Sequence, residues 1–141
     1  MSVRCSTKCL EIYEAIRKGK KYRYIIFRIT PDAVIDVETI GPRDNDYKQF
    51  MEDLMRNGAS ECRYGLFDLE YTRVCEVTKQ QMKREKLVLL SWCPSNAKPK
   101  GKILYLSFLH PFMNQLKGIH YYKTVGESIE LSRDEMEGYF H

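Results

Sequence analysis

The apolar positions near the start of the chain repeat with helical spacing. Four of them fall at i, i+3, i+4 and i+7, the spacing of one buried helix face: Cys9, Ile12, Tyr13 and Ile16. Ser6 is placed to cap the N-terminus of this helix, and Gly19 is a suitable terminator. The pattern therefore predicts a first amphipathic helix between these two residues.

A second stretch gives the clearest helical pattern of the chain. Its apolar stripe consists of Tyr47, Phe50, Met51, Leu54 and Met55. Asp44 or Asn45 offers an N-cap, and Gly58 follows the last residue of the stripe. We predict a helix that buries this stripe and exposes the polar residues between its members.

Between and after these helices the pattern changes to that of strands. "KYRYIIFRI" (21–29) and "AVIDVETI" (33–40) are rich in β-branched and aromatic residues, and Pro31-Asp32 separates them. So short a connection predicts an antiparallel hairpin. "CRYGLFDLEY" (62–71) predicts another strand, and the nearly continuous apolar run "KLVLLSW" (86–92) predicts a central strand buried on both faces. The polar segment 72–86 between them is predicted to be a long exposed loop.

The remaining third of the chain predicts shorter elements. "KILYLS" (102–107) favours a strand, and Leu109–Lys117 favours a helix that ends at Gly118 and holds Pro111 in its first turn, where proline is tolerated. "GIHYYKT" (118–124) predicts a short strand. Ser132 and Glu135 form a capping box for a terminal helix. The whole order predicts one α/β domain over residues 1–141, with a mixed sheet of five or six strands between helices.

Composition and charge narrow the class of protein. The chain has 141 residues, 43% hydrophobic and 30% charged, with a net charge of +4, which is typical of a globular domain with a mild preference for acidic partners. No run approaches the roughly 18 apolar residues that cross a membrane, and the start is too short and polar for a secretory signal. The five cysteines contain no CxxC pair, which favours reduced thiols in the cytoplasm.

Catalytic patterns find little support. His110, His120 and His141 lack zinc-site spacing, and no phosphate-binding glycine loop occurs, so we expect no metal and no cofactor. Cys93 is a candidate nucleophile, but a structural role after a buried strand is favoured. Asp68 and Glu70 lie two apart on one strand face, where a solvated or lysine-paired face is favoured over acid–base work.

Three basic clusters stand out instead: "RKGKKYR" (17–23), "KREK" (83–86) and "KPKGK" (98–102). Each one alone fits a solvated surface, whereas three together favour an anionic partner. Because no RNA-recognition motif accompanies them, we do not expect nucleic acid to be that partner.

Several stretches, taken in order, resemble the actin-depolymerising factor/cofilin family. "GKKYRYIIFRI" resembles its first strand, "ECRYGLFDLEY" its third, and "KREKLVLLSWCPSNAKPKGKILY" its segment of basic residues, core strand, Trp-x-Pro, lysine turn and Tyr. The loop "TRVCEVTKQQM" has the length found in animal members, and the resemblance is closest to insect cofilins. It covers about Cys9 to Ser132. The fold of the family, a mixed sheet between helices, agrees with the layout predicted above.

The resemblance implies a non-enzymatic actin-binding protein. Members of the family bind actin monomers through the N-terminus, the lysine turn and the following helix, which enters a hydrophobic cleft of actin. A second surface touches the neighbouring subunit of a filament, and binding changes filament twist and promotes severing and subunit loss. The resemblance further implies competition by phosphoinositides, location in the cytoplasm and cytoskeleton with the nucleus as an alternative, and a monomeric state.

Carried over by position, the resemblance assigns residues to both surfaces. The monomer side comprises Ser2, Val3, Lys98, Lys100, Lys102, Leu109, His110, Phe112, Met113 and Lys117. The filament side comprises Lys83, Arg84, Lys86 and Glu137. Ser2 is the nearest counterpart of the N-terminal serine whose phosphorylation switches off actin binding in the family, through charge repulsion.

The chain departs from the family where that helix is expected. The family pattern is near "ASSKDALKKxLxG", and this chain has "LSFLHPFMNQLKG", so Leu109 replaces a contacting lysine and His110 an acidic residue. Met113 and Asn114 replace a basic pair. The lost charges favour weaker actin binding, whereas burial of Leu109, Phe112 or Met113 in the cleft of actin opposes that loss.

Both ends of the chain depart as well. The family start is Met-Ala-Ser-Gly-Val, two residues longer than Met1-Ser2-Val3, and Gly138 and Tyr139 stand near a C-terminal acidic–basic pair. Two hypotheses follow. The first is an actin-binding protein of altered or weakened activity, which binds monomers and filaments and promotes severing and depolymerisation. The alternative is an interaction module on the same fold, with little actin activity, that binds phosphoinositides or another protein through its basic loops.

Overall fold

The computed structural model describes residues 3–126, which form three helices and six strands. The helices are α1 (Thr7–Arg17), α2 (Tyr47–Asn57) and α3 (Pro99–Gln115). The strands are β1 (Arg4–Cys5), β2 (Tyr22–Ile29), β3 (Val34–Pro42), β4 (Arg63–Val74), β5 (Gln81–Trp92) and β6 (Tyr121–Val125). None of these helices is long and apolar enough to span a bilayer.

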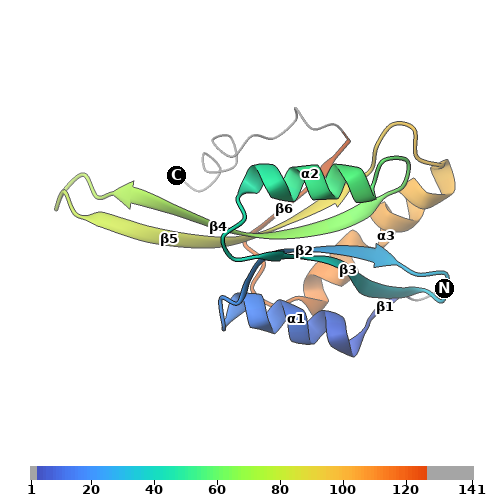
Figure 1. Ribbon diagram of the computed structural model, residues 1–141, viewed down its shortest axis with the longest axis horizontal. Coiled ribbons are helices and arrows are strands. Elements are labelled where there is room, and N and C mark those ends of the chain that lie inside the picture. The colour runs from blue at the N-terminus through green and yellow to red at the C-terminus, as the bar shows by residue number, and fades with distance from the viewer. Residues whose placement is uncertain (1–2, 127–141) are drawn as a thin grey trace.

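All six strands join in one mixed sheet in the order β1-β3-β2-β4-β5-β6. The pairs β2–β3, β2–β4 and β4–β5 are antiparallel, and the outer pairs β1–β3 and β5–β6 are parallel. Helix α2 covers one face, and α1 and α3 cover the other (Figure 1). The prediction of an α/β fold with a mixed sheet between helices is confirmed.

The inner half of β5 shows why a continuous apolar run marks a strand between two layers. Leu87 and Leu89 pack into the core under α1 and α3. Val88, Leu90 and Trp92 pack into the opposite core, under α2. Because successive side chains of a strand alternate between faces, both faces must be apolar when both are covered.

The caps of the first two helices confirm one prediction and correct another. The Ser6 hydroxyl accepts from the amide of Cys9 at 3.0 Å, as an N-cap should. In α2 the cap is Asp46, and the predicted Asp44 or Asn45 was wrong. Asp46 stands directly before the helix and three residues from Gln49, so the two residues bond each other's backbone amides as a capping box.

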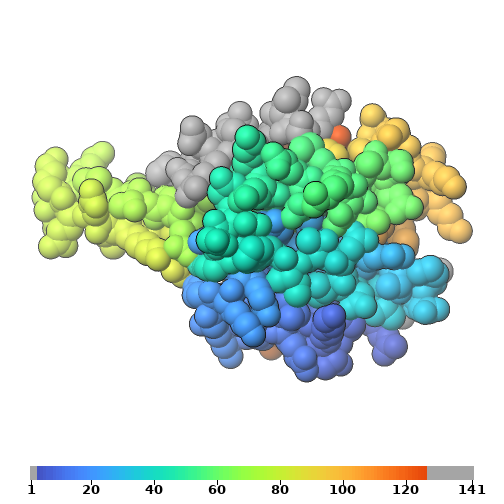
Figure 2. Space-filling view, viewed as in Figure 1, coloured from blue at the N-terminus to red at the C-terminus, as the bar shows by residue number. Residues whose placement is uncertain are grey.

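The predicted loop 72–86 is mostly strand. Strands β4 and β5 form a continuous antiparallel ladder from Arg63↔Trp92 to Val74↔Gln81, which leaves only residues 75–80 as the turn. Its outer half projects beyond the body of the molecule (Figures 1 and 2). Solvent reaches both faces of this half, so its sequence shows no alternation of apolar and polar positions, and the backbone ladder joins the strands.

The predicted strand 102–107 is also wrong, because α3 runs without interruption through it. Tyr105, Leu109 and Phe112 are spaced i, i+4, i+7 and are all buried. This helical period outweighs the local strand propensity of "KILYLS". Pro99, not Pro111, occupies the first turn, and Pro111 lies inside the helix near its end. The helix ends at Gln115, two residues before the predicted end at Lys117, and the turn after it contains Gly118, whose φ of +96° suits glycine.

Smaller differences concern the ends of the sheet. The short final strand is confirmed as β6, whereas the two-residue β1 was not predicted. The backbone of β1 joins the sheet edge beside Val34 and Ile35. The predicted capping box of Ser132 and Glu135 lies outside the described residues.

Candidate functional site

Helix α3 exposes apolar side chains as well as burying them. Ile103 is 66% exposed and Leu106 48% exposed, although both belong to a well-formed helix. We define the α3 face by seven of the exposed residues of this helix and its preceding turn: Lys98, Lys100, Ile103, Leu106, Ser107, His110 and Asn114. Exposed apolar side chains beside lysines are typical of a protein-binding surface.

The inward side of α3 belongs to the core and corrects part of the predicted contact set. Phe112 is fully buried and packs edge-on against Phe27 and close to Tyr64. Leu109 is only 7% exposed, and Met113 is partly buried against the same core. Leu109 and Phe112 therefore stabilise the fold and are not available to a partner. Once the helix begins at Pro99, its period turns them inward and turns Ile103 and Leu106 outward.

The turn before α3 is held in place by hydrogen bonds to the backbone. The Lys102 ammonium donates to the carbonyl of Ser95 at 2.9 Å, and the Asn96 amide donates to the carbonyl of Ala59 at 3.1 Å. Lys98 and Lys100 are exposed, whereas Lys102 is half-buried. Lys102 thus anchors the turn, and the other two lysines present charge to solvent.

The N-terminal segment lies beside the far end of the same helix. The Cys5 amide donates to the side chain of Gln115 at 3.2 Å. Val3 is 8% exposed and packs in the core, so it is removed from the contact set as well. Lys117 is exposed just after α3. Ser2 and Glu137 lie outside the described residues.

The outer half of the β4–β5 hairpin forms a second exposed surface. We define the hairpin surface as Arg73, Val74, Val77, Met82, Lys83 and Arg84, which are all exposed. Val77 at the turn is 90% exposed. Lys86, predicted to belong to the same basic cluster, is half-buried nearer the body. The hairpin and the lysine turn project at opposite ends of the molecule (Figure 2).

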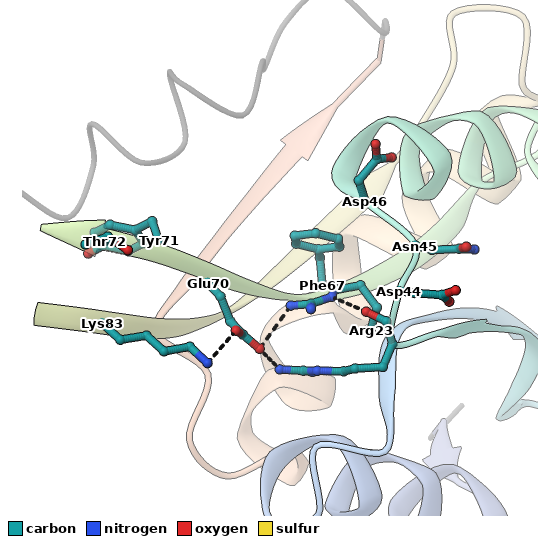
Figure 3. Close-up of a pocket in the computed structure, with 10 residues that line it drawn as sticks. Arg23, Asp44, Asn45, Asp46, Phe67, Glu70, Tyr71, Thr72 and Lys83 are labelled. Atoms are coloured by element: carbon teal, nitrogen blue, oxygen red, sulfur yellow. Dashed lines mark hydrogen bonds and ion pairs between the residues drawn. The ribbon is translucent and has the colours of Figure 1, made fainter.

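A cluster of ion pairs ties the base of the hairpin to the neighbouring strands. Figure 3 shows the Glu70 carboxylate meeting cations from three directions. They are Arg23 at 3.2 Å, Lys83 at 2.9 Å, and Arg43 in direct contact. The cluster borders a hollow of about 600 Å³ next to the link between β3 and α2. These contacts hold the hairpin at a defined angle to the body.

Asp68 lies two residues earlier on the same strand and is fully buried. Its Oδ2 atom accepts from Lys20 at 2.9 Å and from Arg43 at 2.8 Å. Among the described residues its Oδ1 atom has no hydrogen-bond partner. The expected lysine pairing is confirmed for Asp68, but a solvated position was wrong. A carboxylate held by two cations serves structure, because a buried charge is stable only when it is paired.

The remaining catalytic candidates are dispersed. Cys93 is half-buried at the end of β5. His120 accepts from the amide of Leu87 at 2.9 Å, and burial lowers the pKa of its imidazole. His110 lies on the α3 face, 3.4 Å from the Asn114 amide. Within residues 3–126 no three potential metal ligands come together.

Comparison with known proteins identifies this arrangement. Residues 2–141 match the family described as cofilin/tropomyosin-type actin-binding protein. The chain belongs to the actin-depolymerising factor/cofilin family. A maize relative, actin-depolymerizing factor 2, is 30% identical over 130 residues, which cover 92% of this chain and 88% of the relative.

Solved structures give the same result. The cofilin of Streptomyces griseoflavus superposes with a TM-score of 0.80 at 32% identity, covering 97% of this chain and 96% of that protein. The actin-depolymerising-factor-like UNC-60A protein of Caenorhabditis elegans has a TM-score of 0.77 at 25% identity, covering 99% and 94%. The resemblance to the family is thereby confirmed, and the finer resemblance to insect cofilins stays a prediction.

The structure sorts the residues assigned from the family resemblance into separate groups. Lys98, Lys100 and His110 lie along the α3 face, and Lys83 and Arg84 lie on the hairpin, where strand alternation directs them to opposite faces. Sequence reasoning missed Ile103, Leu106 and Val77. Extending the helical period of Tyr105 and Leu109 back to Pro99 would have found the first two. No periodic signal marks Val77, because it lies in a turn.

Proposed function

We propose that this cofilin-family chain binds actin monomers through the α3 face and actin filaments through the α3 face and the hairpin surface together, and that it promotes filament severing and depolymerisation. The observation that carries the proposal is the exposure of Ile103 and Leu106 beside Lys98 and Lys100 on one rigid helix. Two surfaces at opposite ends of a small domain suit contact with two successive subunits of a filament.

The α3 face combines exposed apolar side chains with positive charge, the two features that fit a hydrophobic cleft with an acidic rim. Ile103 and Leu106 supply apolar area that binding would remove from water, at roughly 25 cal/mol per Å². Lys98 and Lys100 supply charge at one end, where they speed encounter with an acidic surface more than they add affinity. Ser107, His110 and Asn114 continue the helix without a cation, so we expect monomer binding weaker than in relatives with a basic helix.

The alternative, an interaction module that binds phosphoinositides, rests on the hairpin surface. Arg73 and Arg84 are exposed on one face of the hairpin, Lys83 and Val74 are exposed on the other, and Val77 is exposed in the turn. Cations near apolar groups favour anionic lipid surfaces. Such binding is compatible with actin binding through α3. We place the protein in the cytoplasm and actin cytoskeleton, with the nucleus as a further location to examine.

Two variants test the proposal. In Ile103→Ser/Leu106→Ser we expect monomer affinity to fall at least tenfold, because removing a central contact of an interface costs about 2 kcal/mol or more. In Val77→Ser/Arg84→Ala we expect co-sedimentation with filaments to weaken while monomer binding is kept. The matched control is Lys48→Ser/Glu52→Ser on the exposed side of α2, which should change neither.

The measurements are fluorescence titration of labelled actin monomers and co-sedimentation with filaments. Absence of interaction with either form at tens of micromolar protein would contradict the proposal. If vesicles containing phosphatidylinositol 4,5-bisphosphate then bind the wild-type chain and not Val77→Ser/Arg84→Ala, the interaction module takes its place.

A further inference from the structure

Two of the five cysteines face each other across the sheet. Arg63 of β4 pairs with Trp92 of β5 at the end of the antiparallel ladder. One residue beyond this pair, Cys62 stands opposite Cys93. Alternation places both on the same side of the sheet. Cys62 lies in the core under α1 and α3, and Cys93 packs against that same core. The Cys93 thiol is close enough to Cys62 to raise the pKa of the Cys62 thiol.

The backbone geometry at this position suits a disulfide. The Cys93 amide donates to the carbonyl of Val125 in β6 at 2.9 Å, so it points away from β4. Cys62 and Cys93 therefore continue the ladder as a non-hydrogen-bonded pair, the type in which opposite Cα atoms lie only about 4.5 Å apart. This separation falls within the range of about 4.4–6.8 Å that disulfides span.

We propose that Cys62 and Cys93 form an oxidisable pair, which a low-molecular-weight disulfide such as oxidised glutathione converts into an intramolecular disulfide between β4 and β5. The Cys93 thiolate attacks one sulfur of the reagent, forms a mixed disulfide and releases one small thiol. The Cys62 sulfur then attacks the Cys93 sulfur and releases the second small thiol. Two protein thiols lose two electrons and two protons, and the reagent gains both.

Exposure decides the order of these two steps. Cys93 is half-buried and can meet the reagent, whereas Cys62 is only 2% exposed. Burial and the neighbouring Cys93 raise the pKa of Cys62, and Lys102 opposes this rise. Because Cys62 must lose its proton in the second step, the reaction should accelerate from pH 7 to pH 9.

Two other thiol sites could compete. Cys5 and Cys9 are in contact at the start of α1, but Cys9 is fully buried. Cys75 lies in the hairpin turn, where hydrogen bonds from Thr78 and Val77 lower its pKa to about 7. An accessible thiol of that kind favours links between molecules. The experiment therefore uses a Cys75→Ser variant as its parent.

Trypsin separates all five cysteines, which makes the pairing directly readable. Cys62 falls in the peptide 57–63 and Cys93 in 87–100, while Cys5 and Cys9 fall in 5–8 and 9–17. After incubation with oxidised glutathione, alkylation and non-reducing digestion, we expect a linked species of 57–63 with 87–100. Dithiothreitol should abolish it, and Cys93→Ser in the same parent should never form it.

The second readout is the midpoint temperature of thermal unfolding. A cross-link between residues 62 and 93 restricts the unfolded chain, so oxidation should raise the midpoint by roughly 5–10 °C, reversibly. Cys62→Ala and Cys93→Ser should show no such rise. The proposal is overturned if only 5–8 and 9–17 become linked, if both thiols remain alkylatable after prolonged oxidation, or if the midpoint rises equally in Cys93→Ser. These readouts do not involve actin.

Discussion

Helices α2 and α3 pack on opposite faces of the same sheet and differ in what they present to solvent. Helix α2 buries Tyr47, Phe50 and Leu54 and exposes Lys48 and Glu52. Helix α3 buries an equally apolar side but exposes Ile103 and Leu106. The first is amphipathic in the ordinary sense, whereas the second carries apolar side chains on its exposed side as well as on the side that packs in the core.

The two helices also differ in how strongly local sequence stabilises them. Helix α2 begins with the Asp46–Gln49 capping box, and it lies so close to β4 that a Cβ at Gly65 would come within 2.7 Å of Phe50. Helix α3 begins at Pro99, its N-cap residue Lys98 makes no side-chain cap hydrogen bond, and the helix contains Pro111. Local sequence therefore specifies α2, and tertiary packing maintains α3. A helix maintained from one side is free to vary on the other.

The largest expected effect on stability comes from removing an inward-facing ring from each helix. Phe112→Ala in α3 and Phe50→Ala in α2 should each lower the free energy of unfolding by about 3–5 kcal/mol, because both rings are fully buried among other aromatic rings. Urea unfolding followed by circular dichroism measures both. A loss below about 1 kcal/mol for Phe112→Ala alone would contradict the conclusion that packing maintains α3.

A smaller effect of opposite sign is expected at Pro111. This exposed proline lies inside α3 and has no amide to donate to the carbonyl of Ser107. Pro111→Ala should raise the free energy of unfolding by about 1–3 kcal/mol, since proline is the least favourable residue in a helix interior. Thermal unfolding checks it, with Ser107→Ala at an exposed position of the same helix as the control. An unchanged or lower midpoint would show that the proline is already accommodated.

The smallest expected effect on the free energy of unfolding concerns the N-cap residues of the two helices. Asp46→Ala should lower the free energy of unfolding by about 1 kcal/mol, because the amide of Gln49 loses its acceptor. Lys98→Ala should cost about zero, because no side-chain hydrogen bond caps α3. Chemical denaturation measures both losses of unfolding free energy. Equal losses would remove the contrast between the helices, and a larger loss for Lys98→Ala would reverse it.

The periodic parts of the fold could be predicted from the sequence. Helices α1 and α2, the β2–β3 hairpin and the doubly buried inner half of β5 each carry a pattern that burial imposes on the chain. The family could also be recognised, because the turn around Pro94 and the strands before it preserve residues in order. At the candidate site the sequence indicated Lys98 and Lys100 on the monomer side and Lys83 and Arg84 on the hairpin.

Only the tertiary structure decided the rest. The outer hairpin was predicted as a loop because both its faces meet solvent. Helix α3 was divided into strand and helix because its exposed face also carries Ile103 and Leu106. The inward position of Leu109 and Phe112, the outward position of Ile103 and the meeting of Cys62 with Cys93 depend on which surfaces other segments cover. Hydrophobic periodicity records a boundary between core and water. The outer hairpin has water on both sides, and α3 carries Ile103 and Leu106 on its exposed side, so neither segment shows that boundary clearly in its sequence.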